Sequence, residues 1–388
     1  MKVGIDGSVL TGPKTGIGHY TAALAEKMAA LEPGSTFYLY ANAPVKPTSG
    51  SSNLVIRSVP CRAKFYWQQK ILPGLLKEDG IELFWGGNYA LPLLTGGLKK
   101  AVTVHDLVFR KYPGTLPLKR VLHLRMLMPA YLRSADQVLV VSEHTRRELV
   151  RYYPGVARKV AVVYPASREI FLSGNGPDES NTAEAAGGSA RGKQLLPDEK
   201  FSGEPGWFEN GYILYVGALE PRKGLDSLIK AYSWYLEETG NAPALVLAGP
   251  LGWKAGPVLK LIKETLPANK VVLTGHLEDE ALAALYRRAK LFVYPSIYEG
   301  FGLPVIEAMA AKVPVITSGG SSLFEVGGKA AVYVAPGDHR ELTDAMARVL
   351  SDQYLQEEMI KKGLLQARRF SWEKAARRTF QIFSTLVK

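Results

Sequence analysis

Two carboxylates flank a glycine-rich turn in the segment from residue 294 to 316, YPSIYEGFGLPVIEAMAAKVPVI. Glu299 stands before the turn at residues 300–303, and Glu307 follows eight residues after Glu299. The apolar residues before the turn predict a strand, and Pro304 suits the first turn of a helix, where its missing N–H has no partner to lose. Backbone N–H groups at such a helix start bind phosphate, and carboxylates accept hydrogen bonds from sugar hydroxyls. The pattern therefore predicts a ligand that carries both a phosphate and a polyol.

A pair of cations follows another apolar strand, in VGALEPRKGLDSL at residues 216–228. The strand ends at Gly217, so Arg222 and Lys223 fall at the carboxyl edge of a sheet, where ligands bind in open α/β folds. Two cations there can neutralise a departing diphosphate. Because an adjacent Arg–Lys pair is also common on solvated turns, its position after the strand is what favours a binding role.

Glycines follow the first strand as well, in TGPKTGIGHY at residues 11–20. Gly16 and Gly18 let the backbone approach a diphosphate closely. The dinucleotide fingerprint fails, because Thr21 stands where its third glycine belongs and Asn42, which is no acid, ends the next strand. This segment therefore predicts a diphosphate contact and disfavours NAD.

His105 and Asp106 end a further apolar strand, in AVTVHDLVF at residues 101–109. A polar pair at the carboxyl end of a buried strand is well placed to meet a ligand. A single histidine is as often a structural hydrogen-bonding residue, so the chemistry leaves both interpretations of His105 open.

The elements that must position these residues alternate between strands and helices along most of the chain, which predicts parallel sheets. The expected strands span 3–5, 36–40, 54–59, 101–104, 137–141, 212–216, 244–248, 271–273, 291–294, 313–316 and 331–334. The expected helices span 19–31, 225–236, 257–266, 279–289, 304–311 and 340–350. A last amphipathic helix places Trp372, Ala376, Phe380, Phe383 and Val387 on one face, with Ser371 as its cap. That face must pack on another part of the protein.

The composition suits two globular domains, with 388 residues, 47% hydrophobic and 22% charged. Gly, Ser, Pro, Glu and Asn dominate residues 173–209, where we expect a linker or mobile loop. The expected domains are therefore 1–172 and 210–371, with the helix at 372–388 packed on the first.

The chain lacks a run of the ~18 apolar residues that a membrane span needs, because His123 and Arg125 interrupt the best candidate at 121–132. Asp6 precedes any apolar stretch long enough for a secretory signal, and Cys61 is the single cysteine. We therefore expect a cytoplasmic protein. Its net charge of +12 is concentrated at residues 99–168, which hold 14 basic and 4 acidic side chains. Such a segment attracts nucleic acid, anionic lipid or phosphorylated small molecules, or is only a solvated face.

The motifs together resemble glycosyltransferase family 4, a retaining group with the GT-B fold that uses nucleotide sugars as donors. The resemblance runs from Gly16 to the closing helix and excludes the segment at 173–209; its most specific motif is E-x7-E, matched by Glu299 and Glu307. It implies two facing Rossmann-like domains, the first for the acceptor and the second for the donor. It also implies that the closing helix crosses back to the first domain.

The resemblance assigns roles residue by residue. Glu299 would contact the hexose and Glu307 the ribose of the donor, while Arg222 and Lys223 would bind its diphosphate. The turn amides would hold the sugar or its phosphate, and they belong to Phe301, Gly302 and Leu303.

In the first domain, Gly16 and Gly18 match the glycine loop of the family, and His105 matches its donor-facing histidine. Ala218 stands where several members carry an arginine, so one phosphate contact is expected to be missing.

The segments VGIDGSVL, HDLVF and VGALEPRKGL most resemble bacterial mannosyl- or rhamnosyl-type members that build surface polysaccharides. This implies transfer of a hexose, with GDP-mannose the favoured donor and a UDP-sugar next, to a lipid-linked or saccharide acceptor, with no tightly bound cofactor. No D-x-D motif ends a strand, which fits a metal-independent enzyme. Phe65, Tyr66 and Trp67, with the basic segment from Lys99 onward, suit peripheral contact with the anionic inner face of a membrane, or much of this aromatic set belongs to the core.

Two other functions remain to be separated from this one. A nucleotide-sugar epimerase or hydrolase of the same fold would consume the donor without an acceptor. A nucleic-acid-binding protein would use the basic segment and would show salt-sensitive binding to random DNA, but it would leave Glu299 and Glu307 unexplained.

Overall fold

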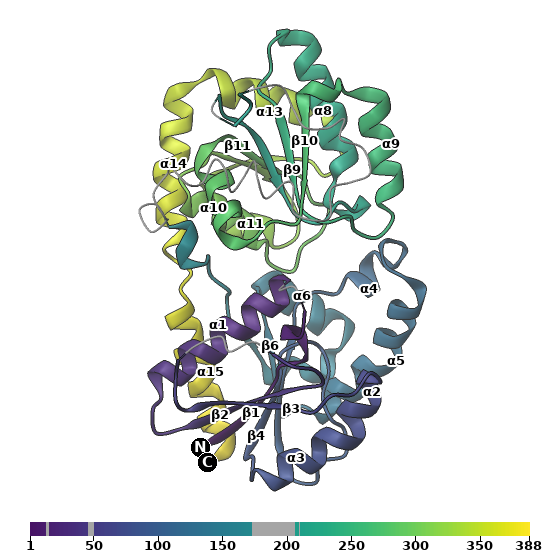
Figure 1. The fold of residues 1–388 in the computed structure, drawn as a ribbon, viewed down its shortest axis with the longest axis vertical. Helices are drawn as coiled ribbons and strands as arrows, with labels where there is room; N and C mark the ends of the chain where they lie inside the picture. The colour runs from purple at the N-terminus through teal and green to yellow at the C-terminus, as the bar shows by residue number, and fades with distance from the viewer. Residues whose placement is uncertain (13–14, 46–49, 173–205, 209) are drawn as a thin grey trace. The chain divides into compact units, whose positions relative to one another are not determined.

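The computed structural model describes residues 1–12, 15–45, 50–172, 206–208 and 210–388. The chain divides into two compact units (Figure 1). The first unit comprises Met1–Pro165 and Phe370–Lys388, and the second comprises Ala166–Arg369. Each unit is one parallel sheet with helices on both faces.

The sheet of the first unit has seven strands in the order β3-β2-β1-β4-β5-β6-β7. The strands are β1 (Lys2–Asp6), β2 (Thr36–Ala41), β3 (Leu54–Ser58), β4 (Leu83–Gly86), β5 (Lys99–Val104), β6 (Gln137–Val140) and β7 (Val160–Val162). The helices are α1 (Gly16–Leu31), α2 (Lys64–Tyr66), α3 (Leu72–Glu78), α4 (Val108–Lys111), α5 (Leu118–Ser134), α6 (Glu143–Tyr152) and α15 (Trp372–Val387). A π-helical turn, η2 (Trp67–Ile71), joins α2 to α3.

The sheet of the second unit has six strands in the order β10-β9-β8-β11-β12-β13. The strands are β8 (Tyr212–Val216), β9 (Leu245–Ala248), β10 (Val271–Gly275), β11 (Ala289–Tyr294), β12 (Val315–Ser318) and β13 (Ala331–Val334). The helices are α8 (Leu225–Thr239), α9 (Ala255–Thr265), α10 (Asp279–Arg288), α11 (Leu303–Ala310), α12 (Leu323–Gly327), α13 (His339–Ser351) and α14 (Gln353–Ala367). Strands such as β8 and β9 are apolar and buried along their whole length, as expected where helices cover both faces.

Short 3-10 turns complete both units: η1 (Ser8–Leu10), η3 (Pro113–Thr115), η4 (Pro154–Lys159), η5 (Glu169–Phe171), η7 (Pro221–Lys223) and η8 (Ala268–Lys270). The turn η7 lies between β8 and α8 and carries the basic pair of Arg222 and Lys223.

The closing helix α15 packs on the first unit, beside α1 and against β4 and β5 (Figure 1). The Ser371 hydroxyl caps it by accepting a hydrogen bond from the amide of Lys374. The Trp372 ring lies 6.0 Å from that of Tyr20, measured between ring centres, and Phe383 is fully buried. The predicted apolar face and the return of this helix to the first unit are therefore confirmed.

The strand and helix predictions are confirmed for the elements that they named, with ends that shift by a few residues. The predictions did not name β4 and β7, which have four and three residues, or the helices α2 to α6, α12 and α14. Of these helices, α14 is only weakly amphipathic. The first unit ends at Pro165 rather than at residue 172, since η5 packs on α10 and α11 of the second unit. Most of the expected linker at 173–209 lies outside the described residues.

One expectation about the glycines is corrected. Gly16 and Gly18 belong to the first turn of α1 and not to a loop, because the helix begins three residues earlier than expected. Its first intrahelical bond runs from the amide of His19 to the carbonyl of Thr15, 2.9 Å away. Amides in a first helical turn have no acceptor within the helix, so those of Gly16 and Gly18 belong to the part of α1 that can donate to a ligand.

The Phe65-Tyr66-Trp67 expectation is corrected in part. Phe65 and Tyr66 are half exposed, whereas Trp67 is fully buried in the core of the first unit. No helix in the described ranges is both long enough and apolar enough to span a bilayer.

Candidate functional site

The predicted donor residues converge where the strand order of the second sheet reverses. Strand β8 lies between β9 and β11, and it pairs in parallel with β11 so that Leu214 lies opposite Phe292. The loops that leave these two neighbouring strands carry Arg222 and Lys223 on one side and Glu299 on the other. Open α/β sheets bind ligands at such a reversal, beyond the carboxyl ends of the strands.

Gly224 allows the two loops to approach each other. Its φ is +69°, and a Cβ built there would lie 2.0 Å from the carbonyl oxygen of Pro295. Across this approach the amide of Ile297 donates to the carbonyl of Arg222, 3.0 Å away. A left-handed conformation in contact with backbone requires glycine, so this position fixes the basic pair against the loop that carries Glu299.

One oxygen of Glu299 receives four donors, from the two loops and from the last residue of β11. Its Oε1 atom lies 2.6 Å from Lys223 Nζ, 3.2 Å from Arg222 Nη1, 2.6 Å from Ser296 Oγ and 3.0 Å from the Tyr294 hydroxyl. The other oxygen, Oε2, has no hydrogen-bond partner among the described residues. The carboxylate is thus anchored through one oxygen, and the second can accept from a ligand.

The charges around Glu299 fix its ionisation. Burial by itself would raise the pKa of this carboxyl, but Lys223 and Arg222 outweigh that effect and lower it to about 2. Tyr294 behaves in the opposite way, because burial and the charge of Glu299 raise the pKa of its hydroxyl well above 10. At neutral pH the carboxylate is therefore charged and Tyr294 remains a donor.

The two cations are already balanced by acids. Arg222 donates from Nη2 to Glu220, 2.7 Å away, as well as to Glu299, and it also donates to the carbonyl of Tyr298. Arg222, Lys223, Glu220 and Glu299 together carry no net formal charge. A diphosphate that binds here must draw the cations away from these carboxylates.

The helix start predicted beside Glu299 is present. Gly302 caps α11 with φ +108°, and Pro304 lies in the first turn. The amides of Gly302 and Leu303 have no hydrogen-bond partner within the described part of the chain. The side chain of Phe301 is buried, and its carbonyl accepts from Ser322. The turn therefore offers backbone donors at the positive end of a helix.

Glu307 is held by different partners from those of Glu299. Its Oε1 atom lies 3.1 Å from Arg168 Nε and 3.0 Å from Arg168 Nη2, and its Oε2 atom lies 3.3 Å from the Tyr286 hydroxyl. Arg168 also contacts Asp279 through Nη1 at 2.5 Å. The side chain of Glu307 is only 5% exposed, so this carboxylate is a buried and compensated charge.

His105 belongs to the first unit, at the end of β5. Its Nε2 atom lies 2.7 Å from the carbonyl oxygen of Gly87, which makes Nε2 the protonated nitrogen of the ring. Tyr20 and Tyr89 pack edge-on against it. Burial lowers the pKa of His105, so the imidazole is neutral at neutral pH.

The glycines of the first unit lie at the corresponding edge of its sheet. Gly16 opens α1, which follows β1, and the strand order of this sheet reverses between β1 and β4. Thr15 caps the helix in an extended conformation without a side-chain hydrogen bond. The helix start therefore remains compatible with a phosphate or hydroxyl ligand.

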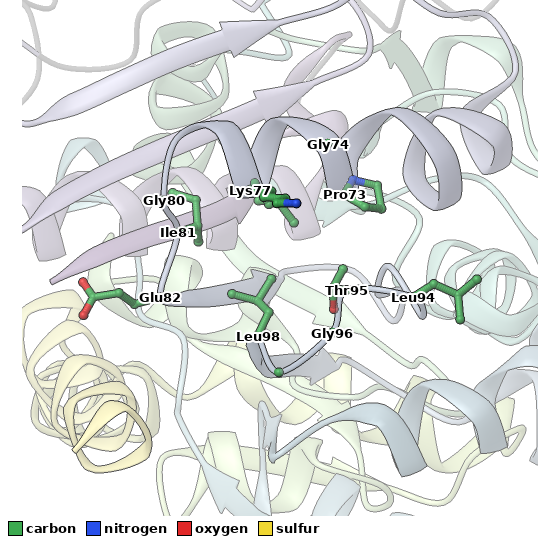
Figure 2. Close-up of a pocket in the computed structure, with 12 residues that line it drawn as sticks. Pro73, Gly74, Lys77, Gly80, Ile81, Glu82, Leu94, Thr95, Gly96 and Leu98 are labelled. Atoms are coloured by element: carbon green, nitrogen blue, oxygen red, sulfur yellow. The ribbon is translucent and has the colours of Figure 1, made fainter.

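A hollow of about 750 Å³ lies elsewhere on the first unit. Helix α3 lines one side of it and the loop before β5 the other (Figure 2). Glu82 and Leu98 in its wall directly precede β4 and β5, which places the hollow at the amino ends of these strands. Its wall is mostly glycine and apolar, with Lys77 and Glu82 as the charged members. It therefore lacks the convergent polar groups of a donor site.

Sequence reasoning missed several residues that complete the two carboxylate sites: Arg168, Glu220, Asp279, Tyr286, Tyr294 and Ser296. Three of them stand within a few residues of a predicted site residue, and that proximity was a usable signal. Arg168 lies 139 positions from Glu307, so only the fold could reveal that contact. No cluster of three or more His, Cys, Asp or Glu side chains suited to a metal ion occurs among the residues described.

Two family models match the chain. The model described as Glycosyl transferases group 1 matches residues 198–366, and the model described as Glycosyltransferase Family 4 matches residues 15–166. One match covers most of the second unit and the other most of the first.

Curated relatives match over most of the chain. The O-antigen chain mannosyltransferase B of Escherichia coli is 30% identical over 96% of this chain and 97% of its own. The O-antigen chain mannosyltransferase RfbU of Salmonella typhimurium is 27% identical over 73% of this chain and 69% of its own.

Solved structures share the fold at lower identity. Sucrose-phosphate synthase from Thermosynechococcus elongatus has a TM-score of 0.75 at 23% identity, over 100% of this chain and 99% of that one. The HepE protein of Anabaena, solved with UDP and glucose, has a TM-score of 0.71 at 16% identity, over 99% of each chain. These likenesses confirm the predicted architecture of two parallel-sheet α/β domains.

Proposed function

The chain belongs to glycosyltransferase family 4, and from this premise we propose that it transfers mannose from GDP-mannose to a lipid-linked or saccharide acceptor in surface polysaccharide synthesis. The observation that carries the proposal is the junction of Arg222, Lys223 and Glu299 at the reversal point of the second sheet. The names of the O-antigen mannosyltransferases that match along the chain support mannose as the hexose. A UDP-sugar is the next donor to test.

We assign the diphosphate of the donor to Arg222 and Lys223. When the bond between the anomeric carbon and the diphosphate oxygen breaks, negative charge grows on the leaving group. Cations already held in place stabilise that charge without reorganising at the moment of reaction. The diphosphate would take over contacts that Glu220 and Glu299 now make with these cations, so binding exchanges one set of ion pairs for another.

We assign the hexose to Glu299 and the ribose to Glu307. Ser296 and Tyr294 anchor Glu299 through Oε1 and are not claimed by the diphosphate, so Oε2 remains the acceptor for a sugar hydroxyl. The amides of Gly302 and Leu303, beside the Phe301 carbonyl, would donate to the sugar or its phosphate. Arg222, Lys223 and these amides would perform the charge stabilisation that a metal ion supplies elsewhere, so we propose that the reaction needs no metal.

The first unit would hold the acceptor. His105 is neutral and donates through Nε2 to the protein itself, which leaves Nδ1 as an acceptor that can face the developing positive charge on the sugar. Gly16 and Gly18, at the start of α1, would lie against the donor diphosphate or the acceptor. Retention at the anomeric carbon is part of this proposal.

The first experiment is thermal unfolding of the purified protein with GDP or UDP, each at large excess over a micromolar dissociation constant. A true ligand at 100 to 1,000 times its dissociation constant adds ~3 to 4 kcal/mol to the stability of the folded state. Stabilisation by GDP alone supports GDP-mannose as donor, and stabilisation by UDP alone transfers the proposal to UDP-sugars. No shift with either nucleotide contradicts the donor site.

A product assay then tests the reaction. The protein is given the stabilising nucleotide's mannose or glucose conjugate, with and without membrane extract as a source of acceptor. Transfer of labelled hexose to the extract supports a transferase. Free hexose released at equal rate without acceptor would instead indicate a hydrolase.

We further propose that the enzyme works at the cytoplasmic face of a membrane through a surface of the first unit called here the basic apolar face. Helix α5 exposes Leu118, Leu122 and Met126 at four-residue intervals, and Phe65 of α2 packs its ring against His123 of α5. Exposed cations accompany these apolar side chains: Lys64, Lys119, Arg120, Arg125 and Arg133. No acidic residue interrupts α5. Exposed apolar side chains ringed by cations suit anionic lipid headgroups.

Vesicle co-sedimentation tests this face. The protein should sediment with vesicles of phosphatidylglycerol and phosphatidylcholine and should dissociate from them as the salt concentration is raised. It should not sediment with vesicles of pure phosphatidylcholine. The double variant Leu122→Glu/Met126→Glu should lose most of the binding. Leu365→Glu, an exposed leucine on α14 of the second unit, is the matched control and should retain it. Equal sedimentation of all three proteins would remove the basic apolar face from the proposal.

A further inference from the structure

Arg168 bridges two acids of the second unit. Its guanidinium meets Glu307 through Nε at 3.1 Å and Nη2 at 3.0 Å, both on Oε1, and meets Asp279 through Nη1 at 2.5 Å. The guanidinium also lies over the ring of Phe171, 4.2 Å from its centre. A planar group with donors on three sides and a ring beneath it has little freedom to turn.

The same cluster fixes the second oxygen of Glu307. The Tyr286 hydroxyl lies 3.3 Å from Oε2, and the Tyr286 ring packs edge-on against Phe171 at 5.2 Å between ring centres. Arg168 and Tyr286 thus hold the carboxylate from opposite oxygens. An ionised carboxylate offers about four acceptor positions, and these contacts fill three of them. The remaining position is on Oε2, so the fixed orientation decides which way Glu307 can accept from a ligand.

Burial makes this orientation depend on Arg168. The side chain of Glu307 is 5% exposed, and that of Arg168 is 18% exposed. A carboxylate at that depth needs a partner cation, and removing the cation leaves an uncompensated buried charge that must turn toward water or take up a proton. Asp279 is 43% exposed, so it binds Arg168 from the side of the guanidinium that lies nearer to solvent.

Arg168 comes from an unexpected part of the chain. It lies three residues after Pro165, in the segment by which the chain enters the second unit, and 139 positions before Glu307. Nothing in the E-x7-E motif specifies it. The donor edge of this unit is therefore completed by the segment that joins the units.

We propose that Arg168 is a positioning residue that orients Glu307 toward the ribose of the donor and so sets the preference for ribonucleotides over deoxyribonucleotides. The inference rests on the proposed function, because it takes Glu307 to be the ribose acceptor. Arg168 itself need not touch the donor. Its effect is to hold Oε2 of Glu307 where hydroxyl donors arrive.

The test compares the dissociation constants of GDP and 2′,3′-dideoxy-GDP, measured by calorimetry, with UDP and its dideoxy form if UDP is the nucleotide that binds. Loss of the hydrogen bond to the charged acceptor Glu307 should weaken binding of the dideoxy form about 10- to 100-fold in the wild type. Arg168→Met should reduce that ratio to within about threefold of unity, as Glu307→Gln does, while weakening the dideoxy form little. The ratio for Arg168→Lys should lie between those of the wild type and Arg168→Met, because the lysine ammonium is a point charge and does not bridge both acids as the guanidinium does.

A matched control is available in the same unit. Arg288 also stacks over a ring, 4.9 Å from the centre of Phe208, and it lies on α10 as Tyr286 does. Arg288→Met removes a stacked guanidinium without touching Glu307, so its ribose preference should equal that of the wild type. A merely structural role of Arg168 would lower stability but leave the preference unchanged.

The outcomes separate the two proposals. A wild type that binds neither nucleotide overturns the proposed function and this inference with it. A wild type that prefers the ribonucleotide, beside a folded Arg168→Met that keeps the same preference, overturns the inference alone. If Arg168→Met does not fold, Arg168→Lys provides the test. An unchanged ribonucleotide preference in that variant overturns the positioning role of the Arg168 guanidinium.

Discussion

The carboxyl edges of the two sheets are built from different chemistry. At the edge of the second sheet, Arg222, Lys223 and Glu299 form one ion-pair network, and Arg168 joins Glu307 to Asp279 in another. At the edge of the first sheet, the aspartates at the ends of β1 and β5 bond to the local backbone instead. Asp6 accepts from the amide of Ser8 and Asp106 from that of Val108, and neither forms an ion pair with another described residue.

The difference follows from what each edge has to hold. Buried ion pairs contribute little net stability, because the desolvation of both charges offsets their attraction. A network of them is therefore expected where a charged ligand must be received, and the diphosphate of a nucleotide sugar is such a ligand. An edge with a neutral imidazole and backbone turns suits a neutral polyol. We infer that this difference in charge between the two sheet edges, called here the charge contrast, reflects a division into a donor site and an acceptor site.

The largest expected effect comes from Gly224, which brings the charged edge together. Gly224→Ala should lower the free energy of unfolding by roughly 3 kcal/mol or more and abolish nucleotide binding, because it adds backbone strain and a clash with Pro295. Gly240→Ala is the control, since Gly240 has nearly the same φ of +67° but open space around its Cβ position. It should cost about 1 to 2 kcal/mol, measured by urea unfolding. Equal losses in both variants would show that the close approach at Gly224 is unimportant.

The next effect concerns the pH range in which the charged edge contributes. Because the pKa of Glu299 is lowered from 4.5 to about 2, its ionisation stabilises the folded state by roughly 3 kcal/mol at pH 7. That contribution is complete above about pH 4.5 and is lost as the pH falls toward 2. The stability difference between wild type and Glu299→Gln should therefore shrink between pH 5 and pH 3 in chemical unfolding. A difference independent of pH would contradict the assigned ion pairs.

Lys223→Ala tests the same edge in turnover. Loss of one preorganised cation should lower kcat at least ~100-fold, because the charge on the departing diphosphate is less stabilised. Lys230→Ala, an exposed lysine on the adjoining helix α8, should keep wild-type turnover. Wild-type activity in Lys223→Ala would remove this lysine, and with it the charge contrast, from the mechanism.

The smallest effect is expected at the neutral edge. Burial lowers the pKa of His105 below 6.5. As the pH falls, this histidine is therefore protonated in the unfolded chain before it is protonated in the folded protein. The stability tied to neutral His105 is complete above pH 6.5 and is lost as the pH falls through that value toward the folded-state pKa. Against His105→Gln, the wild type should lose stability between pH 7.5 and pH 5. Thermal unfolding across that range measures it, and parallel curves for the two proteins would show that folding leaves the pKa of His105 unchanged, which contradicts the buried neutral imidazole.

The sequence predicted much of the charged edge because its signals are local. Strand β11, the turn and α11 follow one another within the E-x7-E motif, and Pro304 and Gly302 mark the helix start. Arg222 and Lys223 likewise follow β8 directly. Two partners that complete the sites were missed because their residue types suggest other roles. Tyr294 is buried inside its strand, where an aromatic residue is typical of a core, and Asp279 resembles an ordinary first-turn acid of α10.

The neutral edge was predicted less well, for a physical reason. A glycine signals conformational freedom in a loop and in a first helical turn alike, so the start of α1 at Gly16 was misplaced. Short strands such as β4 carry too few residues for a periodic pattern. Trp67, beside Phe65 and Tyr66, shows that an aromatic run does not tell which ring faces the core.

The sequence by itself determined the alternation of strands and helices, the carboxylate pair and the cations after β8, because each depends on neighbours within a dozen residues. Only the tertiary structure decided which oxygen of Glu299 is anchored and that Arg168 reaches Glu307 across 139 positions. Burial and charge pairing depend on which segments the fold packs together, and that information is not local in the chain.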